Sequence, residues 1–202
     1  MLDARLRPLV DRSLDGAGAW LSGRGLTANA VSLIAFGCGL AAMAALALRW
    51  DLAALALLAA NRLGDGLDGA VARAAGPTDL GGFLDIVLDF IVYAAIVFGF
   101  VLGRPDQALP GAFLLFSFMG TGASFLAYAV IAAKRGLSTS LRGRKSLYYL
   151  GGLTEGTETI ALLAAICLFP GAFPWLAWGF GAACWITTAT RILAAWQSFA
   201  ER

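Results

Sequence analysis

The chain of 202 residues contains no histidine and few charged side chains. Without an imidazole it cannot use Ser-His-Asp or Cys-His nucleophile pairs, and His-ligated zinc sites are excluded. Its cysteines, Cys38, Cys167 and Cys184, lie singly in apolar stretches, so neither a CxxC metal clip nor a disulfide framework is predicted. Charged residues make up 14% and hydrophobic residues 59% of the chain, whereas soluble domains carry about 25% charged residues. One core of this size cannot bury that excess, which predicts a membrane protein.

Six apolar segments approach the length of about 20 residues that a helix needs to cross about 30 Å of hydrocarbon. The second stays apolar from Leu52 to Ala60 and then meets polar residues, while the fourth carries no charge. We predict spans at residues 30–48, from 52 onward, and at 83–102, 108–133, 148–169 and 173–196. The predicted fold is all-α and integral to the membrane, with a single domain over residues 1–202 and a six-helix part over residues 30–196.

The first 21 residues are too charged to cross a bilayer. Apolar residues at positions 2, 6, 9, 10 and 14 have helical spacing, with acidic and basic residues between them. Residues 2–21 are therefore predicted to form an amphipathic helix that lies on the membrane interface.

Lysine and arginine residues are distributed very unevenly between the two sides of these spans. If the N-terminus is cytoplasmic, thirteen of the fifteen basic residues fall on the cytoplasmic side, and only Arg49 and Arg104 fall outside. This positive-inside asymmetry predicts an inner-membrane protein with both termini cytoplasmic. Both termini can lie on the same side only if the number of spans is even, which agrees with the six apolar segments.

Four acidic residues lie near the cytoplasmic ends of the second and third spans. On a helix, Asp65 and Asp68 are i,i+3 neighbours and Asp85 and Asp89 are i,i+4 neighbours, so each pair shares one face. A short Gly-Pro loop makes the two helices antiparallel neighbours, and the four carboxylates can then converge. A carboxylate inside a span costs about 2.5–3.5 kcal/mol even on lenient scales, which favours a functional interpretation.

Four carboxylates in a low-dielectric site repel one another unless cations lie between them. Oxygen donors without histidine or thiolate favour Mg²⁺, Mn²⁺ or Ca²⁺. Arg73 offers a guanidinium fork to phosphate oxygens, and neighbouring small residues leave room for a ligand. A buried ion-pair network with packing glycines is the alternative interpretation. The small residues are Gly66, Gly69, Ala72, Gly81 and Gly82.

This stretch resembles the signature of the CDP-alcohol phosphotransferase family, Asp-x2-Asp-Gly-x2-Ala-Arg-x8-Gly-x3-Asp-x3-Asp. Seven residues, rather than eight, separate Arg73 from Gly81, and choosing Gly82 instead shortens the step to Asp85. Which glycine faces the nucleotide therefore stays open. The rest of the chain is similar to a bacterial inner-membrane branch that resembles phosphatidylglycerophosphate synthase. The matching residues are Asp65, Asp68, Gly69, Ala72, Arg73, Gly81, Asp85 and Asp89.

The resemblance implies transfer of a phosphatidyl group from CDP-diacylglycerol to a small alcohol, with release of CMP. It implies that Asp89 is the base for the incoming hydroxyl and that two Mg²⁺ or Mn²⁺ ions bind at the site. The implied partner is the lipid bilayer, and no nucleic acid is expected to bind. A homodimer is left open. The implied metal ligands are Asp65, Asp68, Asp85 and Asp89, and the implied CDP-binding residues are Asn29, Gly69, Ala72, Arg73 and Gly81.

Residues 27–32 loosely resemble the family's Thr-Pro-Asn-x2-Thr stretch, without its proline. This resemblance places Asn29 in the nucleotide pocket. Alternatively, Thr27 simply caps the first span, and the sequence leaves both interpretations open.

The acceptor alcohol is predicted from cations near span five. In relatives with phosphorylated acceptors such cations hold the acceptor phosphate, which favours glycerol 3-phosphate or inositol phosphate. Loop cations can instead only set topology and contact anionic lipids. Glu155 and Glu158 could pair with cations or bind a cationic acceptor, so serine or another amino alcohol stays open. The candidate cations are Arg135, Arg142, Arg144, Lys145 and Arg191.

Two classes of protein other than an enzyme also carry intramembrane acids. A small cation transporter would carry its acids near the bilayer midplane, typically with an inverted repeat, and the sequence shows no repeat. A non-catalytic lipid-binding protein could retain the site as a relic, yet every signature acid is present. Metal-dependent release of CMP would separate the enzyme from both.

Overall fold

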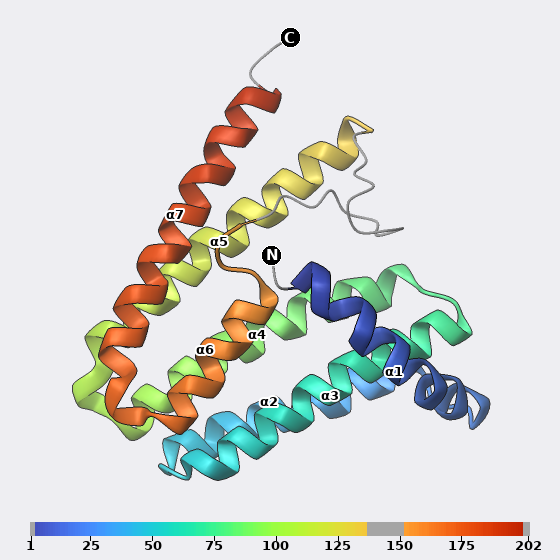
Figure 1. Ribbon diagram of the computed structural model, residues 1–202, viewed down its shortest axis with the longest axis horizontal. Helices are drawn as coiled ribbons and strands as arrows, with labels where there is room; N and C mark the ends of the chain where they lie inside the picture. The colour runs from blue at the N-terminus through green and yellow to red at the C-terminus, as the bar shows by residue number, and fades with distance from the viewer. Residues whose placement is uncertain (1–2, 137–151, 200–202) are drawn as a thin grey trace.

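The computed structural model describes residues 3–136 and 152–199, and within these ranges it is entirely helical, with no strand. The all-α prediction is thereby confirmed. Figure 1 shows α5 and α7 running side by side on one side of the molecule, with α1, α2 and α3 together on the other. The elements are α1 (Asp3–Gly23), α2 (Ala28–Ala47), α3 (Asp51–Ala75), α4 (Asp79–Gly103), η1 (Pro105–Gln107), α5 (Ala108–Lys134), α6 (Gly156–Leu168), η2 (Pro170–Ala172) and α7 (Phe173–Phe199).

Three helices in the described ranges are long and apolar enough to cross a membrane: α2, α4 and the stretch Pro105–Lys134 that contains α5. Their mean hydropathies are 2.1, 2.5 and 1.7. The segments Gly156–Leu168 and Pro170–Phe199 qualify only as a pair, bent by 115° at the break between them. Length and composition therefore support three or four of the six predicted spans, enough for an integral membrane protein.

The predicted second, fifth and sixth spans do not meet that criterion alone. Helix α3 has the length but carries Arg62, Asp65 and Asp68 in its second half. Helix α6 begins at Gly156, not near residue 148, and has only 13 residues, or about 20 Å at 1.5 Å per residue. Part of the predicted fifth span, within residues 137–151, lies outside the described residues.

A tight connection reverses the chain between α3 and α4, and both helices pack against α2. Helix α3 ends before Gly76, whose φ of 101° is readily adopted only by glycine. Thr78 then caps α4, and its hydroxyl accepts a hydrogen bond from the Gly81 amide at 3.0 Å. Because the reversal takes only residues 76–78, the acids on either side of it face each other.

Glycine lets α2 lie directly against both of these helices. A Cβ atom on Gly64 of α3 would come within 2.6 Å of the Ala35 Cβ on α2. A Cβ on Gly99 of α4 would overlap the backbone carbonyl of Met43 on α2. These two contacts fix the spacing of the α2, α3 and α4 group, which carries the candidate site.

Helix α1 packs across α3 near the end that carries the acids (Figure 1). Gly18 allows the approach, because a Cβ there would come within 2.5 Å of the Ala70 Cβ. Asp15 of α1 also accepts two hydrogen bonds from Arg73, at 2.8 and 3.0 Å. The predicted N-terminal helix therefore exists, while its position at a membrane interface stays a prediction.

Aromatic stacking joins the C-terminal half to this group. The rings of Phe100 on α4 and Phe173 on α7 are fully buried and stack with centroids 4.2 Å apart. At the same end of α4, Arg104 donates to Asp51 of α3 at 2.6 Å. The far ends of α3 and α4 are thus tied by an ion pair that lies away from the acid cluster.

Substitution Gly99→Ala is expected to lower the thermal unfolding temperature of the detergent-solubilised protein. The added methyl has no space against the Met43 carbonyl, and such overpacking costs about 1–3 kcal/mol. Gly37→Ala is the matched control, because Gly37 is exposed on α2 and a Cβ there meets nothing within 4 Å. Equal unfolding temperatures for the two variants would contradict this account of the helix spacing.

Candidate active site

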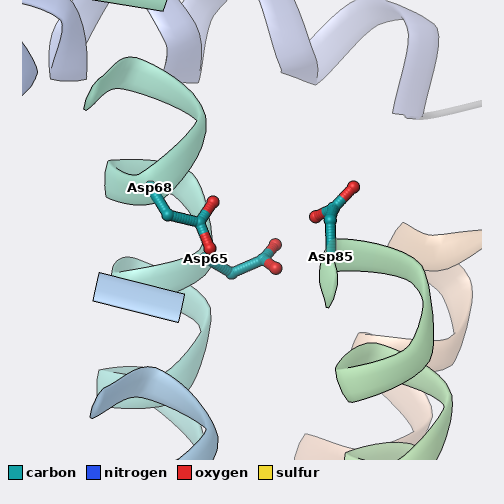
Figure 2. A group of neighbouring side chains, drawn as sticks. All are labelled: Asp65, Asp68 and Asp85. Atoms are coloured by element: carbon teal, nitrogen blue, oxygen red, sulfur yellow. The ribbon is translucent and has the colours of Figure 1, made fainter. Parts of the chain in front are cut away.

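Three carboxylates from α3 and α4 converge in the described structure. One oxygen from each of Asp65, Asp68 and Asp85 lies within 4.8 Å of the others. Figure 2 shows Asp65 and Asp68 projecting from one helix toward Asp85 on the other. Oxygen ligands around one divalent ion at 2.0–2.6 Å can lie at most about 5 Å apart. The separation and the donor type therefore both fit Mg²⁺ or Mn²⁺.

Ser32 of α2 fixes the orientation of Asp68. Its hydroxyl lies 2.5 Å from Oδ2 of Asp68, and both side chains are buried. Donation to one oxygen leaves the other oxygen to face a metal ion. The sequence pointed to Ser32 only through its spacing from Asn29, and it was not among the predicted site residues.

Asp89 lines the same small cavity but has different partners. Its Oδ1 accepts a hydrogen bond from Arg62 Nη2 at 2.7 Å, and its Oδ2 accepts one from the Tyr93 hydroxyl at 3.1 Å. The cavity measures about 10 Å³, about the space of one water molecule. The structure therefore groups three of the four predicted acids as potential ligands and pairs the fourth with an arginine.

Arg62 is a second residue of this site that the sequence analysis missed. Its side chain is only 13% exposed and also lies 3.7 Å from Asp65. The one available signal was a cation directly after the second apolar run, at Asn61-Arg62. That signal is indistinguishable from a topology determinant until the neighbouring helix is placed.

The predicted CDP-binding residues lie around the open ends of α2, α3 and α4. Asn29 is close to Gly81, since a Cβ on Gly81 would lie 3.4 Å from Asn29 Oδ1. A Cβ on Gly82 would meet nothing within 4 Å, so Gly81 is the glycine beside Asn29. Gly69, Ala72 and Arg73 follow on α3.

Two details concern individual members of that set. Thr27 caps α2, with its hydroxyl accepting from the Ala30 amide at 3.2 Å, which confirms the capping interpretation for this residue. Arg73, predicted to hold phosphate, contacts Asp15 through an ion pair in which the two side chains are 43% and 55% exposed.

The predicted acceptor-binding cations are not all described. Arg135 is exposed and donates to the backbone carbonyls of Ser198 and Phe199 near the end of α7. Arg191 is 6% exposed in α7 and donates to the Thr121 carbonyl of α5 at 2.9 Å. Arg142, Arg144 and Lys145 lie outside the described residues.

Glu155 and Glu158 form the start of α6. The Glu155 side chain accepts a hydrogen bond from the backbone at N3, and the Glu158 side chain accepts one from the Glu155 amide at 3.2 Å. This reciprocal pair is a capping box, which satisfies two amides at the helix start. Both carboxylates thus have a local structural role.

Comparison with known proteins gives the family. The sequence profile described as CDP-alcohol phosphatidyltransferase matches residues 25–195. Inner membrane protein YnjF of Escherichia coli (strain K12) is 52% identical over 193 residues, which cover 95% of this chain and 94% of that protein. An archaetidylinositol phosphate synthase of Pyrococcus horikoshii is 38% identical over 101 residues, which cover 50% of this chain and 54% of that protein.

Solved structures agree in fold. Phosphatidylinositol phosphate synthase PgsA1 of Mycobacterium tuberculosis, with CDP-DAG bound, matches with a TM-score of 0.74 at 21% identity, over 92% of this chain and 94% of that chain. A second structure of that enzyme, in complex with manganese and citrate, also gives a TM-score of 0.74 at 21% identity, over 91% of this chain and 88% of that chain. The signature acids, the helical fold and the profile match over residues 25–195 agree, and the chain belongs to the CDP-alcohol phosphatidyltransferase family.

Proposed function

We propose that the protein transfers a phosphatidyl group from CDP-diacylglycerol to a phosphorylated polyol and releases CMP. The observation that carries this proposal is the convergence of Asp65, Asp68 and Asp85 beside Asp89, at the family signature. Relatives named as synthases of archaetidylinositol phosphate and phosphatidylinositol phosphate support a phosphorylated acceptor. Glycerol 3-phosphate and inositol phosphate are the proposed candidates.

The carboxylate cluster would hold the metal. Asp65, Asp68 and Asp85 supply hard oxygen donors at suitable separations. We propose that two ions bind, with Asp89 near the second. Such ions would neutralise the donor's diphosphate and the departing CMP. Ser32 keeps one Asp68 oxygen occupied and thereby aims the other into the cluster.

Asp89 is the proposed general base. The acceptor hydroxyl attacks the phosphorus that carries diacylglycerol, and its proton passes to Asp89 as the new oxygen–phosphorus bond forms. The bond from that phosphorus to the bridging oxygen breaks, and CMP leaves with its electrons. Asp89 suits this role because it lines the cavity but lies outside the three-oxygen group.

The nucleotide would lie over the small residues of α3 and α4. Asn29 and Gly81 are adjacent across the helix ends. Gly69 and Ala72 have little or no side chain, which leaves space above α3 for a ligand. Arg73 would exchange its exposed contact with Asp15 for donor phosphate. That exchange is inexpensive, because exposed ion pairs contribute only about 0–1 kcal/mol.

An apolar groove supports a lipid donor. It has a volume of about 390 Å³ and runs between α1, α3 and α6, with Arg62 at its wall. Because Arg62 also lines the carboxylate cavity, an acyl chain in the groove would begin next to the reacting phosphates. The apolar residues of the groove are Leu14, Leu55, Leu58, Ala59, Leu63, Ile160 and Ala164.

Arg191 is the best placed acceptor-phosphate ligand among the described cations. It contacts α5 at Thr121, and the next residue, Gly122, packs against Phe90, which directly follows Asp89. This chain of contacts links a buried cation to α4 at the residue that follows the base. Arg135, Arg142, Arg144 and Lys145 stay candidates for an outer basic surface, and the capping box of α6 weakens the case for an amino-alcohol acceptor.

We also propose the six-span topology, with both termini and the active site cytoplasmic. The apolar helices support membrane insertion, and the distribution of lysine and arginine supports this orientation. Helix α1, docked on α3 beside the acids, would lie along the cytoplasmic interface. The homodimer and the single domain over residues 1–202 stay predictions.

Purified protein with CDP-diacylglycerol, Mg²⁺ and a panel of alcohols is expected to release CMP, fastest with a phosphorylated polyol. Asp89→Asn removes the proton acceptor and is expected to lower kcat by about 10²–10⁴-fold. Asp106→Asn, in η1 beyond the opposite end of α4, serves as control. CMP would be quantified by chromatography and product lipid by mass. Full activity in Asp89→Asn would show that Asp89 is not the general base.

Mn²⁺ binding tests the metal site without turnover. Asp68→Asn is expected to weaken Mn²⁺ binding by about tenfold or more, because it removes a charged ligand from the cluster. Free Mn²⁺ would be measured by electron paramagnetic resonance during titration, with Asp106→Asn again as control. Equal affinity in the two variants would show that the cluster does not bind the ion.

Arg191→Ala is expected to raise KM for the phosphorylated acceptor by about tenfold or more and to leave KM for CDP-diacylglycerol unchanged. The reason is loss of the guanidinium that would hold the acceptor phosphate. Unchanged acceptor KM, with normal thermal stability, would exclude Arg191 from acceptor binding.

A further inference from the structure

We infer that Arg62 and Tyr93 are positioning residues for Asp89. This inference rests on the proposed function, because it concerns the group assigned there as the base. Arg62 lies on α3 and Tyr93 on α4, one turn from Asp89. Neither belongs to the family signature found in the sequence.

The two donors account for both oxygens of Asp89. Arg62 Nη2 donates to Oδ1 at 2.7 Å and the Tyr93 hydroxyl donates to Oδ2 at 3.1 Å. A third bond, from Arg62 Nη1 to the Tyr93 oxygen at 3.3 Å, closes the triangle. The terminal torsion of an aspartate is otherwise broad, so these contacts select one orientation of the carboxylate.

Arg62 is itself held in place. Its Nε donates to the Asn61 side-chain oxygen at 2.8 Å, and the Asn61 amide donates to the Ala35 carbonyl of α2 at 2.8 Å. Its guanidinium carbon also lies 5.4 Å from the centroid of the Tyr93 ring. Hydrogen bonds therefore connect Asp89 on α4 to α3 and, through Asn61, to α2.

Arg62 also separates Asp89 from the metal cluster. Its Nη1 lies 3.7 Å from Asp65 while Nη2 contacts Asp89, so one guanidinium lies between two carboxylates. With its charge compensated by a fixed cation, Asp89 keeps this orientation at the edge of the three-oxygen group. The arrangement leaves a carboxylate at a defined place for the hydroxyl proton, next to the acids that would hold metal.

A second ion pair joins the start of α3 to the residue that follows α4, without Arg62. Arg104 donates to Asp51 at 2.6 Å, is 10% exposed and lies over the Phe100 ring at 4.3 Å. It joins the same two helices at their other ends with the same chemistry. Arg104 therefore offers a matched control for the structural effect of breaking a buried pair.

The experiment compares Arg62→Lys, Arg62→Gln and Tyr93→Phe with Arg104→Lys and Arg104→Gln. For the Arg62 variants we expect kcat to fall by about 10- to 100-fold with KM for CDP-diacylglycerol within about twofold, because a misplaced base slows only the chemical step. Lysine should not rescue, since it lacks the planar fork. Tyr93→Phe should lower kcat by a smaller factor, and the Arg104 variants should lower only the unfolding temperature.

A binding measurement supplies a readout independent of turnover. Arg62→Gln is expected to bind Mn²⁺ several-fold more tightly, because it removes a nearby positive charge and releases Asp89 toward the cluster. If Arg62 only stabilised the packing of the helices, its substitution would weaken Mn²⁺ binding. The same paramagnetic resonance titration would be applied to every variant.

The outcomes separate this inference from the proposed function. Normal kcat in Arg62→Lys, or unchanged or weaker Mn²⁺ binding in Arg62→Gln, would overturn positioning while Asp89→Asn still tested the base. If the wild-type protein released no CMP with any acceptor, the proposed function would fail, and the Mn²⁺ titration would still decide whether Arg62 restrains Asp89.

Discussion

Repulsion among like charges in an apolar setting is the constraint on which the rest of this structure depends. Helices α3 and α4 bring four carboxylates to one end of an otherwise hydrophobic helix group, and such an arrangement is stable only with compensating cations. Arg62 is one of them, placed between Asp65 and Asp89. A divalent ion held by Asp65, Asp68 and Asp85 would add further positive charge to this site. Metal binding and the stability of this end of the fold are therefore two aspects of one electrostatic problem.

Close backbone contact makes that arrangement possible. The Gly76 turn limits the α3–α4 connection to residues 76–78, and Gly64 and Gly99 let α2 approach both helices. Only with α2 this near can Ser32 reach Asp68, and the Ala35 carbonyl reach Asn61. The small residues of the sequence thus do more than leave room for a nucleotide, since they also set the distances at which polar side chains on α2 orient the acids.

The convergence of Asp65, Asp68 and Asp85 could be predicted because helical periodicity and a short loop are local properties. The contacts of Asp89 could not, because Arg62 lies 27 positions earlier and its partner depends on how two helices rotate against each other. For the same reason the contact of Arg73 with Asp15 of α1, 58 positions away, could not be predicted. The short α6 was missed because its capping box, Glu155 with Glu158, lies within an apolar run that also reads as a membrane span.

The two arginines of α3 differ in exposure, and that difference suits them to different roles. Arg73 and Asp15 are about half exposed, so solvent screens their attraction and the pair can separate at little cost when phosphate arrives. Arg62 is 13% exposed and donates hydrogen bonds to Asn61, Tyr93 and Asp89. Separating it would leave buried charges without partners, which is strongly destabilising. An exchangeable cation at the rim and a fixed cation beside the base are what a site needs if it must admit a charged donor without disturbing its proton acceptor.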